Sequence, residues 1–167
     1  MEDNMIISEQ GLENKFLTFM LDNQLMAIPL VNVEQIVGVL PTTPLPEMPD
    51  YCKGVVDLRG SIVPVIDLRL RFGRVEIPYT DKTSFIICRV DQHLVGCVVD
   101  YVEEVVTVDD KQKSAVPTVG AAQNGDYATG IARLGTDESA KIVLLLDAAK
   151  IVKDADAETI LGCGEEE

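Results

Sequence analysis

Few residues of this chain have the types and spacings that catalysis or metal binding requires. Among its 167 residues there is one histidine, His93, and the four cysteines form no Cys-x-x-Cys pair. A zinc site needs clustered thiolate and imidazole ligands, so we predict no metal site and no cofactor. The phosphate-cradling, metalloprotease and nucleophile-elbow motifs are also missing from the sequence. The chain is therefore predicted not to be an enzyme, with an unrecognised catalytic site kept as an alternative.

The acidic residues suit turns and helix caps better than acid–base catalysis, because they stand where strands and turns are expected to end. They are Asp57, Asp67, Asp100, Glu103, Glu104 and Asp147. His93 falls in an expected turn, Asp91-Gln92-His93, where a solvated side chain is the simplest interpretation. Cys88 and Cys97 lie in strand-like runs and are predicted to be small buried residues. All four cysteines are expected as thiols in a reducing cytosol.

One side chain could grip another protein. In GVVDLRGSIVPVIDLRLRFG, Gly54–Gly73, two β-rich runs at Val55–Leu58 and Ile62–Ile66 flank Arg59-Gly60-Ser61. Gly60 can adopt a positive φ, so the stretch predicts a β-hairpin with Arg59 near its tip. A guanidinium is always charged and can bind a carboxylate or a backbone in two places. Taken alone, the stretch still favours a solvated turn residue.

The net charge of −14 belongs mostly to the ends of the chain. Residues 1–14 carry four acids and residues 154–167 carry six, without a base in either segment, which leaves −4 for residues 15–153. Such ends are expected to be extended, solubilising tails. The charge argues against binding to nucleic acid, which needs a basic face. No apolar run is long enough to insert into a membrane, and the first residues resemble no export signal, so we expect a cytoplasmic protein.

The first half of the chain reads as short strands joined by turns. Lys15–Leu21 and Gln24–Leu30 form an expected hairpin around Asp22-Asn23, and apolar spacing at Val31–Ile36 suggests a helical turn. Val37–Leu40 is again strand-like. Four prolines between Pro41 and Pro49 predict an ordered surface connector. After the Arg59 hairpin, one helical turn is expected with Asp67 as its N-cap and Gly73 at its end.

The second half repeats the first. A shift of 69 residues without a gap places Phe16–Val39 on Phe85–Val108, with seven identities and mostly apolar pairs elsewhere. The later runs also correspond, GVVDLRG with Gly130–Gly135 and IVPVID with Ile142–Asp147. Chance similarity between β-rich runs is the alternative, but the unbroken register followed by matched runs in the same order favours duplication.

Duplication predicts the architecture. Each half contains about five short strands and only single-turn helices, which is typical of a small β-barrel. One such barrel has a marginal core, so two are expected to pack together around a shared core with a cleft between them. The fold class predicted is all-β, with two five-stranded barrel subdomains and short helices.

The Arg59 hairpin also carries a family resemblance. GVVDLRGSIVPVIDLRLRFG resembles the signature of the CheW family of chemotaxis coupling proteins, G-[VI]-x-N-L-R-G-x-[IV]-[VI]-P-[VI]-[VI]-D-L-R. The similarity extends over nearly all of Lys15–Val152, including PLVNVEQI, HLVGCVVDYVEEV and YATGIARLG. Neither a kinase region nor a receiver domain fits in this chain, so the resemblance implies a stand-alone coupling protein.

The resemblance implies two SH3-like five-stranded barrels and a non-enzymatic adaptor. The implied partners are a CheA-type histidine kinase and the cytoplasmic tips of methyl-accepting chemoreceptors, in membrane-associated arrays. The family's receptor-facing positions map onto six residues, Val33, Gln35, Arg59, Gly96, Val102 and Val105. Kinase-facing residues are not assigned, and the loop around Pro117–Gly120 and the second-barrel strands are candidates only. A related scaffold in another receptor–kinase circuit, such as surface motility or gene regulation, remains an alternative.

Two positions depart from the family pattern. Asp57 stands where the family usually has Asn, and Gln35 stands where an acid is frequent. The comparison of the two halves favours Arg59 as a contact residue, because the second half has a longer polar connector, Thr136–Lys141, instead of the tight tip.

The expected organisation is an acidic tail at 1–14, a CheW-like domain at 15–153 with repeats near 16–68 and 85–148, and an acidic tail at 154–167.

Overall fold

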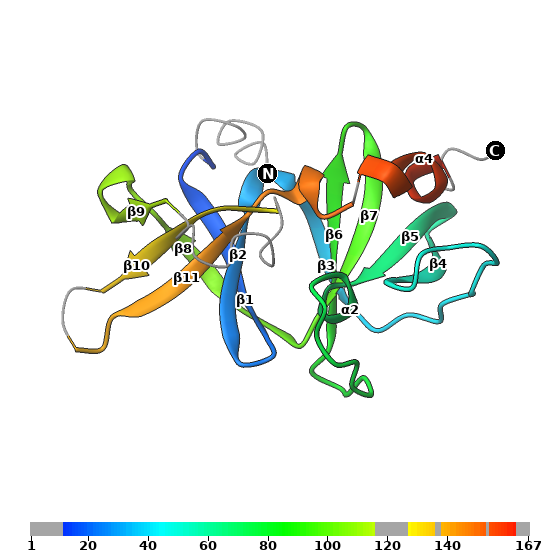
Figure 1. Cartoon of the computed structure of the whole chain (residues 1–167), viewed down its shortest axis with the longest axis horizontal. Coiled ribbons are helices and arrows are strands. Elements are labelled where there is room, and N and C mark those ends of the chain that lie inside the picture. The colour runs from blue at the N-terminus through cyan, green and yellow to red at the C-terminus, as the bar shows by residue number, and fades with distance from the viewer. Residues whose placement is uncertain (1–11, 116–126, 136–137, 153, 163–167) are drawn as a thin grey trace.

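Two β-sheets lie side by side in the computed structural model, which describes residues 12–115, 127–135, 138–152 and 154–162 (Figure 1). The first sheet has the strand order β8-β1-β2-β11-β10-β9, and the second has the order β3-β6-β7-β5-β4. We call them, with their connections, subdomain 1 and subdomain 2. The protein is therefore all-β with two subdomains, as predicted.

The strands are short, and only small helical segments interrupt them. Subdomain 1 contains β1 (Lys15–Leu21), β2 (Gln24–Pro29), β8 (Tyr101–Thr107), β9 (Lys113–Ser114), β10 (Ala128–Leu134) and β11 (Lys141–Leu146). Subdomain 2 contains β3 (Val33–Gly38), β4 (Cys52–Leu58), β5 (Ser61–Asp67), β6 (Ser84–Val90) and β7 (His93–Val99). The helical segments are η1 (Leu30–Asn32), α2 (Leu68–Arg71), η2 (Asp110–Gln112), η3 (Ala148–Lys150) and α4 (Asp154–Gly162).

The two sequence repeats exchange strands. β1 and β2 of the first repeat join the strands of the second repeat in subdomain 1, while β6 and β7 of the second repeat join those of the first in subdomain 2. In each sheet an antiparallel hairpin meets a parallel neighbour, β2 with β11 and β7 with β5. A sequence repeat is therefore not a subdomain, and the subdomains are interleaved.

The shift of 69 residues holds strand by strand. It carries β1 (15–21) onto β6 (84–90), and it carries the β1–β2 turn onto the β6–β7 turn. Asp22 and Asn23 have φ of 53° and 65°, and their counterparts Asp91 and Gln92 have 49° and 73°. Even the irregular pairing is copied: Phe19 pairs with Val102 as Cys88 pairs with Val33. These matched registers support the duplication inferred from the sequence.

Each sheet is closed by the segment that leaves its edge strand. After β3 the Pro-rich connector crosses to β4, where Thr43 and Val55 exchange backbone hydrogen bonds of 2.8 and 2.9 Å. After β8 the chain continues into β9, where Ser114 pairs with Ile131 of β10. Val55 and Ile131 are counterparts in the repeat, so both barrels close in the same way.

A glycine lies under each closing segment. A Cβ on Gly54 would overlap the Thr43 carbonyl oxygen, and a Cβ on Gly130 would lie 2.9 Å from the Ser114 carbonyl oxygen. Gly54 also has φ of 131°, which L side chains rarely adopt. Sequence conveys this constraint only as the repeated Gly at the start of GVVDLRG and GIARLG.

The cores follow from the alternation of side chains along the strands. In β1, Phe16 faces the core of subdomain 1, whereas Leu17, Phe19 and Leu21 belong to a larger core shared by both subdomains. β6 repeats this pattern, with Phe85 and Ile87 in the core of subdomain 2 and the alternating residues in the shared core. Strands buried on both faces read as continuous apolar runs. The prediction of a shared core is confirmed.

Several local expectations are confirmed. Asp67 caps α2 by accepting hydrogen bonds from the amides of Arg69 and Leu70, and Gly73 follows the helix with φ of 76°. In the Pro-rich connector the only extended pairing is the single bridge at Thr43. Cys52, Cys88 and Cys97 are buried thiols, while Cys163 lies outside the described residues.

Four expectations need correction. The helical turn covers Leu30–Asn32 and not 31–36, because Val33 already begins β3 and pairs with β6. His93 is the first residue of β7 and not part of the turn, which needs only two residues. Subdomain 1 has a sixth strand, the two-residue β9. Residues 154–162 form α4 with Ile160 fully buried, so an extended tail from residue 154 is wrong for this part.

The N-terminal tail expected at 1–14 lies largely outside the described residues, since they begin at residue 12. The candidate kinase-facing segment Pro117–Gly120 is outside them as well. No helix in the described part of the chain is both long and apolar enough to cross a membrane.

Candidate functional site

Arg59 lies at the tip of the β4–β5 hairpin, as predicted. The turn is formed by two residues, Arg59 with φ of 55° and Gly60 with φ of 91°, and Ser61 already pairs with Leu58. Two successive positive φ angles match the right-handed twist of the strands and keep the turn tight. The Arg59 side chain is exposed, and no ion pair or hydrogen bond engages its guanidinium among the described residues. This cation is therefore available to a partner.

Asp57 closes this turn. Its Oδ1 accepts a hydrogen bond of 2.8 Å from the Gly60 amide. An Asn side chain at this position has a carbonyl oxygen that can accept the same bond, so replacing the family's usual Asn by Asp retains the acceptor. The difference is an added negative charge two residues before Arg59.

Residues of β3 alternate between half-buried and exposed, and both predicted residues are half-buried. Val33 is half-buried and packs against the shared core, and Gln35 is half-buried opposite Ile87 of β6. Between them Glu34 is exposed and binds the guanidinium of Arg89 at 3.1 and 3.2 Å. A partner on this strand would therefore meet the edges of Val33 and Gln35 and a neutralised ion pair.

The predicted residues of β8 occupy the equivalent strand of subdomain 1. Val102 is half-buried against the shared core, and Val105 is 48 % exposed. The pairing with β1 is irregular here, and the Thr18 hydroxyl fills the gap by donating to the Glu104 carbonyl at 2.7 Å. β3 and β8 each end the strand order of their sheet, so each has only one neighbour among the described strands.

Gly96 does not lie on the surface. It is buried in β7 between Ile87 of β6 and Val65 of β5, and an added Cβ would lie 3.4 Å from the Ile87 Cδ1. A larger residue would press on the core of subdomain 2. The six mapped positions therefore occupy different places: Arg59 and Val105 are exposed, Val33, Gln35 and Val102 are half-buried, and Gly96 is interior.

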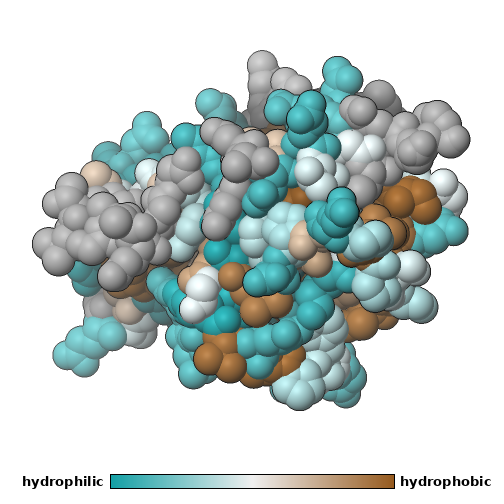
Figure 2. All heavy atoms as spheres, turned by 45° about the vertical axis from the view of Figure 1, so that its right-hand side comes forward, coloured by the Kyte–Doolittle hydropathy of each residue, from teal (hydrophilic) through white to brown (hydrophobic). Residues whose placement is uncertain are grey.

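Exposed aliphatic side chains are repeated in the two subdomains. Ile36 and Ile62 of subdomain 2 are 43 % and 40 % exposed, and their repeat counterparts are Val105 and Ile142 of subdomain 1. On the face shown in Figure 2, hydrophobic side chains form separate patches bordered by hydrophilic ones. The surface therefore offers small apolar contact areas on both subdomains.

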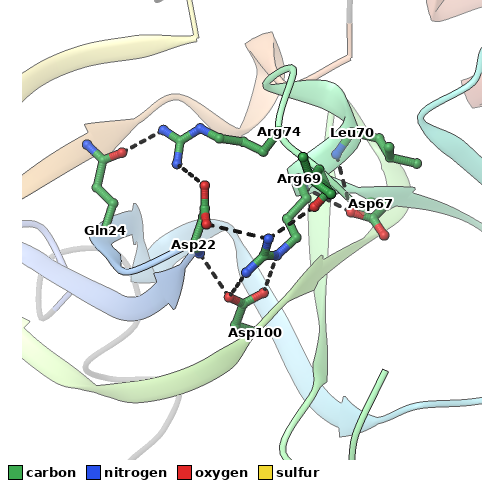
Figure 3. Close-up of polar contacts among 8 residues, drawn as sticks. Asp22, Gln24, Asp67, Arg69, Leu70, Arg74 and Asp100 are labelled. Carbon is green, nitrogen blue, oxygen red and sulfur yellow. Dashed lines mark hydrogen bonds and ion pairs between the residues drawn. The ribbon is translucent and has the colours of Figure 1, made fainter. Parts of the chain in front are cut away.

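A polar cluster where the subdomains meet was missed in the sequence. Arg69 of α2 binds Asp100 in two places, through Nε to Oδ1 at 2.9 Å and Nη2 to Oδ2 at 2.7 Å (Figure 3). Asp22, in the β1–β2 turn, lies 3.5 Å from the same guanidinium and donates its amide to Asp100 Oδ2 at 2.8 Å. Arg74 then joins Asp22 at 3.3 Å and Gln24 at 2.7 Å.

The cluster holds Asp100 in its charged form. Burial by itself raises the pKa of Asp100, but the hydrogen bonds from Arg69 and the Asp22 amide, with the charge of Arg69, lower it further than burial raises it. The same partner, Asp100, raises the pKa of Arg69. The residues of this cluster lie between positions 22 and 100 and belong to three segments that are far apart in the sequence. No local spacing therefore indicates that they pair. The available signal was the difference between repeats, Arg69 against Ala149.

A second contact joins the equivalent helical segments of the two repeats. Arg71 of α2 donates to the carbonyl oxygens of Lys150 and Ile151, next to η3. Its guanidinium lies over the rings of Tyr51 and Tyr127, which are themselves repeat counterparts, with centroid distances of 5.6 and 5.2 Å. α2 and η3 thus meet where the two repeats face each other.

No group of three or more His, Cys, Asp or Glu side chains suited to a metal ion is found within the described ranges. The buried thiol of Cys97 is hydrogen-bonded with Cys88, and this bond and burial raise the pKa of Cys97 well above 9.0. A thiol with a raised pKa and no solvent access is a poor nucleophile.

Comparisons with known proteins agree on one family. The family model described as CheW-like domain matches residues 15–156. A chemotaxis protein CheW from Klebsiella aerogenes is 33% identical over 146 residues, covering 87% of this chain and 86% of the relative. Protein FrzA of Myxococcus xanthus is 23% identical over 155 residues, covering 92% and 94%. The crystal structure of the scaffolding protein TtCheW from Thermoanaerobacter tengcongensis matches with a TM-score of 0.75 at 28% identity, covering 84% of this chain and 92% of that one.

Proposed function

Because the chain belongs to the family of CheW-like domain proteins, we propose that it is a scaffold of chemotaxis signalling that joins chemoreceptors to a CheA-type histidine kinase and catalyses no reaction itself. Its place of action would be the cytoplasm, at membrane-associated receptor arrays. The proposal rests on the family membership, on the similarity to a protein described as scaffolding, and on a surface with an unpaired cation and small apolar patches.

The geometry of Arg59 is the observation that supports the proposed binding to a chemoreceptor. Its guanidinium is exposed on a rigid two-residue turn and has no partner within the described part of the chain. The counterpart hairpin of subdomain 1 has Gly135 after Leu134 and no arginine at its tip. A cation without an internal partner has no ion pair to break on binding, and it can bind carboxylates or backbone carbonyls of another chain.

The receptor contact would combine this cation with apolar edges. A chemoreceptor tip is a helical hairpin, and a helix presents apolar side chains three and four residues apart. Val33 of β3 and Val102 and Val105 of β8 supply aliphatic contacts, with Gln35 as a polar neighbour. Gly96 would act indirectly, since it shapes the core beneath β6 and does not reach the surface.

The direct test is Arg59→Glu. In a surface contact, reversing the charge of a central arginine should weaken binding to a purified receptor tip at least about tenfold, or about 1.4 kcal/mol. Binding can be measured by isothermal titration calorimetry against a helical-hairpin receptor fragment. Arg133→Glu is the matched control, because it makes the same charge change at an exposed site on the corresponding hairpin of subdomain 1. Equal affinity of the Arg59→Glu variant and the wild type would remove Arg59 from the contact.

A second candidate is a scaffold of the same kind in another receptor–kinase circuit. This alternative stays open because Protein FrzA, a relative whose name does not describe it as a chemotaxis protein, matches 92% of this chain. Both candidates use the same surfaces, so only the identity of the kinase and receptor recovered with the purified chain separates them.

A further inference from the structure

The chain passes between the subdomains at two repeat-related places that differ in how they are held. At the first crossover, between β2 and β3, the chain runs through η1; at the second, between β7 and β8, it runs through Asp100. The residue equivalent to Asp100 at the first crossover is Val31, which is 50 % exposed. The residue equivalent to Arg69 is Ala149. Only the second crossover can therefore carry the Arg69–Asp100 ion pair.

That ion pair ties elements of both subdomains to one point. Arg69 belongs to α2 at the end of β5 in subdomain 2, while Asp22 belongs to the β1–β2 turn of subdomain 1. Asp100 lies between them, and its amide also donates to the Met20 carbonyl of β1 at 3.1 Å. Figure 3 shows the guanidinium of Arg69 pointing at both carboxylates from the helix above them.

Burial and paired hydrogen bonds restrain the Arg69–Asp100 contact. The Arg69 and Asp100 side chains are only 12 % and 18 % exposed, and the two parallel hydrogen bonds fix the plane of the guanidinium against the carboxylate. The third nitrogen of the Arg69 guanidinium, Nη1, donates to the Val75 carbonyl at 3.0 Å. Such a pair is screened little by salt and leaves few rotamers open, so it restrains direction as well as distance.

Resting on the proposed function, we infer that Arg69 is a positioning residue that fixes subdomain 1 relative to subdomain 2, so that β8 and β3 face one receptor hairpin together. Val102 and Val105 follow Asp100 directly on β8. A rotation at this crossover would move them relative to Val33 on β3, which belongs to the other sheet. Arg69 itself lies between α2, Asp100 and Asp22 and makes no receptor contact.

The first measurement reads the geometry without any partner. Spin labels at Lys82 in subdomain 2 and Lys141 in subdomain 1, both exposed, report the distance between the subdomains by double electron–electron resonance. Cys163 is replaced by Ser, and the buried cysteines are shielded from labelling. The parent protein should give a single narrow distance distribution, and Arg69→Met and Asp100→Asn should broaden or shift it. Arg69→Lys, which keeps the charge but not the paired geometry, should lie between.

Lys53→Met is the matched control. It removes the ion pair with Glu76, which joins two segments of subdomain 2 and does not reach subdomain 1. Its distance distribution should equal that of the parent. Circular dichroism verifies folding of every variant, and Asp100→Asn preserves shape should Arg69→Met fail to fold.

The second measurement connects the geometry to binding. Affinity for the receptor fragment should fall about tenfold in Arg69→Met and Asp100→Asn, and remain unchanged in Lys53→Met. Unchanged distance distributions in both cluster variants would overturn the inference, and so would altered distributions with undiminished receptor affinity. If the parent protein binds no receptor fragment, the proposed function fails, while the distance distributions still decide whether Arg69 fixes the two subdomains.

Discussion

Asp57 and Gly60 show how single residues shape the surface that the protein offers. Asp57 accepts the Gly60 amide and holds the turn on which Arg59 is exposed. The sequence was sufficient to locate this hairpin and its tip, because a Gly between two β-rich runs is a local signal. It was not sufficient to place Gly96, since burial depends on strand pairing with β5 and β6, which lie elsewhere in the chain.

At the residue scale, Gly54→Ala should be strongly destabilising. The added Cβ would overlap the Thr43 carbonyl and the backbone of Pro44, and φ of 131° is strained for alanine. Backbone overlap together with strain should lower the free energy of unfolding by about 3 kcal/mol. Urea denaturation followed by circular dichroism measures this. Gly38→Ala is the control, because a Cβ there meets nothing within 4 Å; equal losses in the two variants would contradict the closing role of Thr43.

A pH dependence follows from Asp100. Its pKa in the folded protein is below the ordinary value of 3.8, so the folded state favours the charged form. The stability that this charge contributes is fully present above about pH 5 and is lost as pH falls past 3.8 through the lower folded pKa. At pH 7 Asp100→Asn should lower the free energy of unfolding by about 1–2 kcal/mol.

Urea unfolding of both proteins at pH 7, 5 and 3 tests this dependence. The difference between the wild type and Asp100→Asn should be the same at pH 7 and 5 and smaller at pH 3. A difference that is constant down to pH 3, or that grows in acid, would mean that the Asp100 charge does not stabilise the fold through Arg69.

At the element scale, local chemistry identified most strands and one helix. Asp67 and Gly73 bound α2 as expected, and the β1–β2 hairpin forms around Asp22-Asn23. α4 was missed, because its acidic residues suggested a tail and its sequence, DADAETILG, has few apolar positions. Ile160 enters the shared core and Asp156 accepts a hydrogen bond from the Tyr51 hydroxyl. The helix is held by tertiary contacts, which sequence periodicity does not reveal.

Ile160→Ala tests whether α4 belongs to the folded core. The side chain is fully buried, and shortening it leaves a cavity in the shared core. A loss of about 2–4 kcal/mol in the free energy of unfolding is expected. Glu158→Ala, an exposed position on the same helix, should change stability by less than about 0.5 kcal/mol. Equal, small effects would show that α4 contributes nothing to the core.

At the scale of the whole molecule, the duplication was visible in the sequence and the exchange of strands was not. The shift of 69 residues reveals which strands are equivalent, but equivalent strands can pair within a repeat or between repeats without changing the alignment. Pairing between repeats gives each subdomain strands from both halves of the chain and buries β1 and β6 on two faces. The Arg69–Asp100 pair then breaks the symmetry of this arrangement at one crossover.

The protein has two similar but distinguishable subdomains, which suits the proposed scaffold for two different partners. Repeat-related surfaces, such as Ile36 with Ile62 and Val105 with Ile142, present like chemistry in two places. The Arg59 turn of subdomain 2 and the Arg69–Asp100 ion pair at the β7–β8 crossover have no counterpart in the other repeat, so the two surfaces differ. Coupling would follow from the relative placement of the partners.

The central claim is tested most directly by a purified three-component capture. A receptor cytoplasmic fragment is fixed on beads, a CheA-type kinase is added, and the kinase retained is measured with increasing amounts of this chain. Arg59→Glu should lower the apparent affinity of the chain at least about tenfold, whereas Arg133→Glu should leave it unchanged. The proposed scaffold role predicts that the amount of kinase retained rises with the amount of the chain and then saturates. Kinase retention that is the same with and without the chain would contradict it.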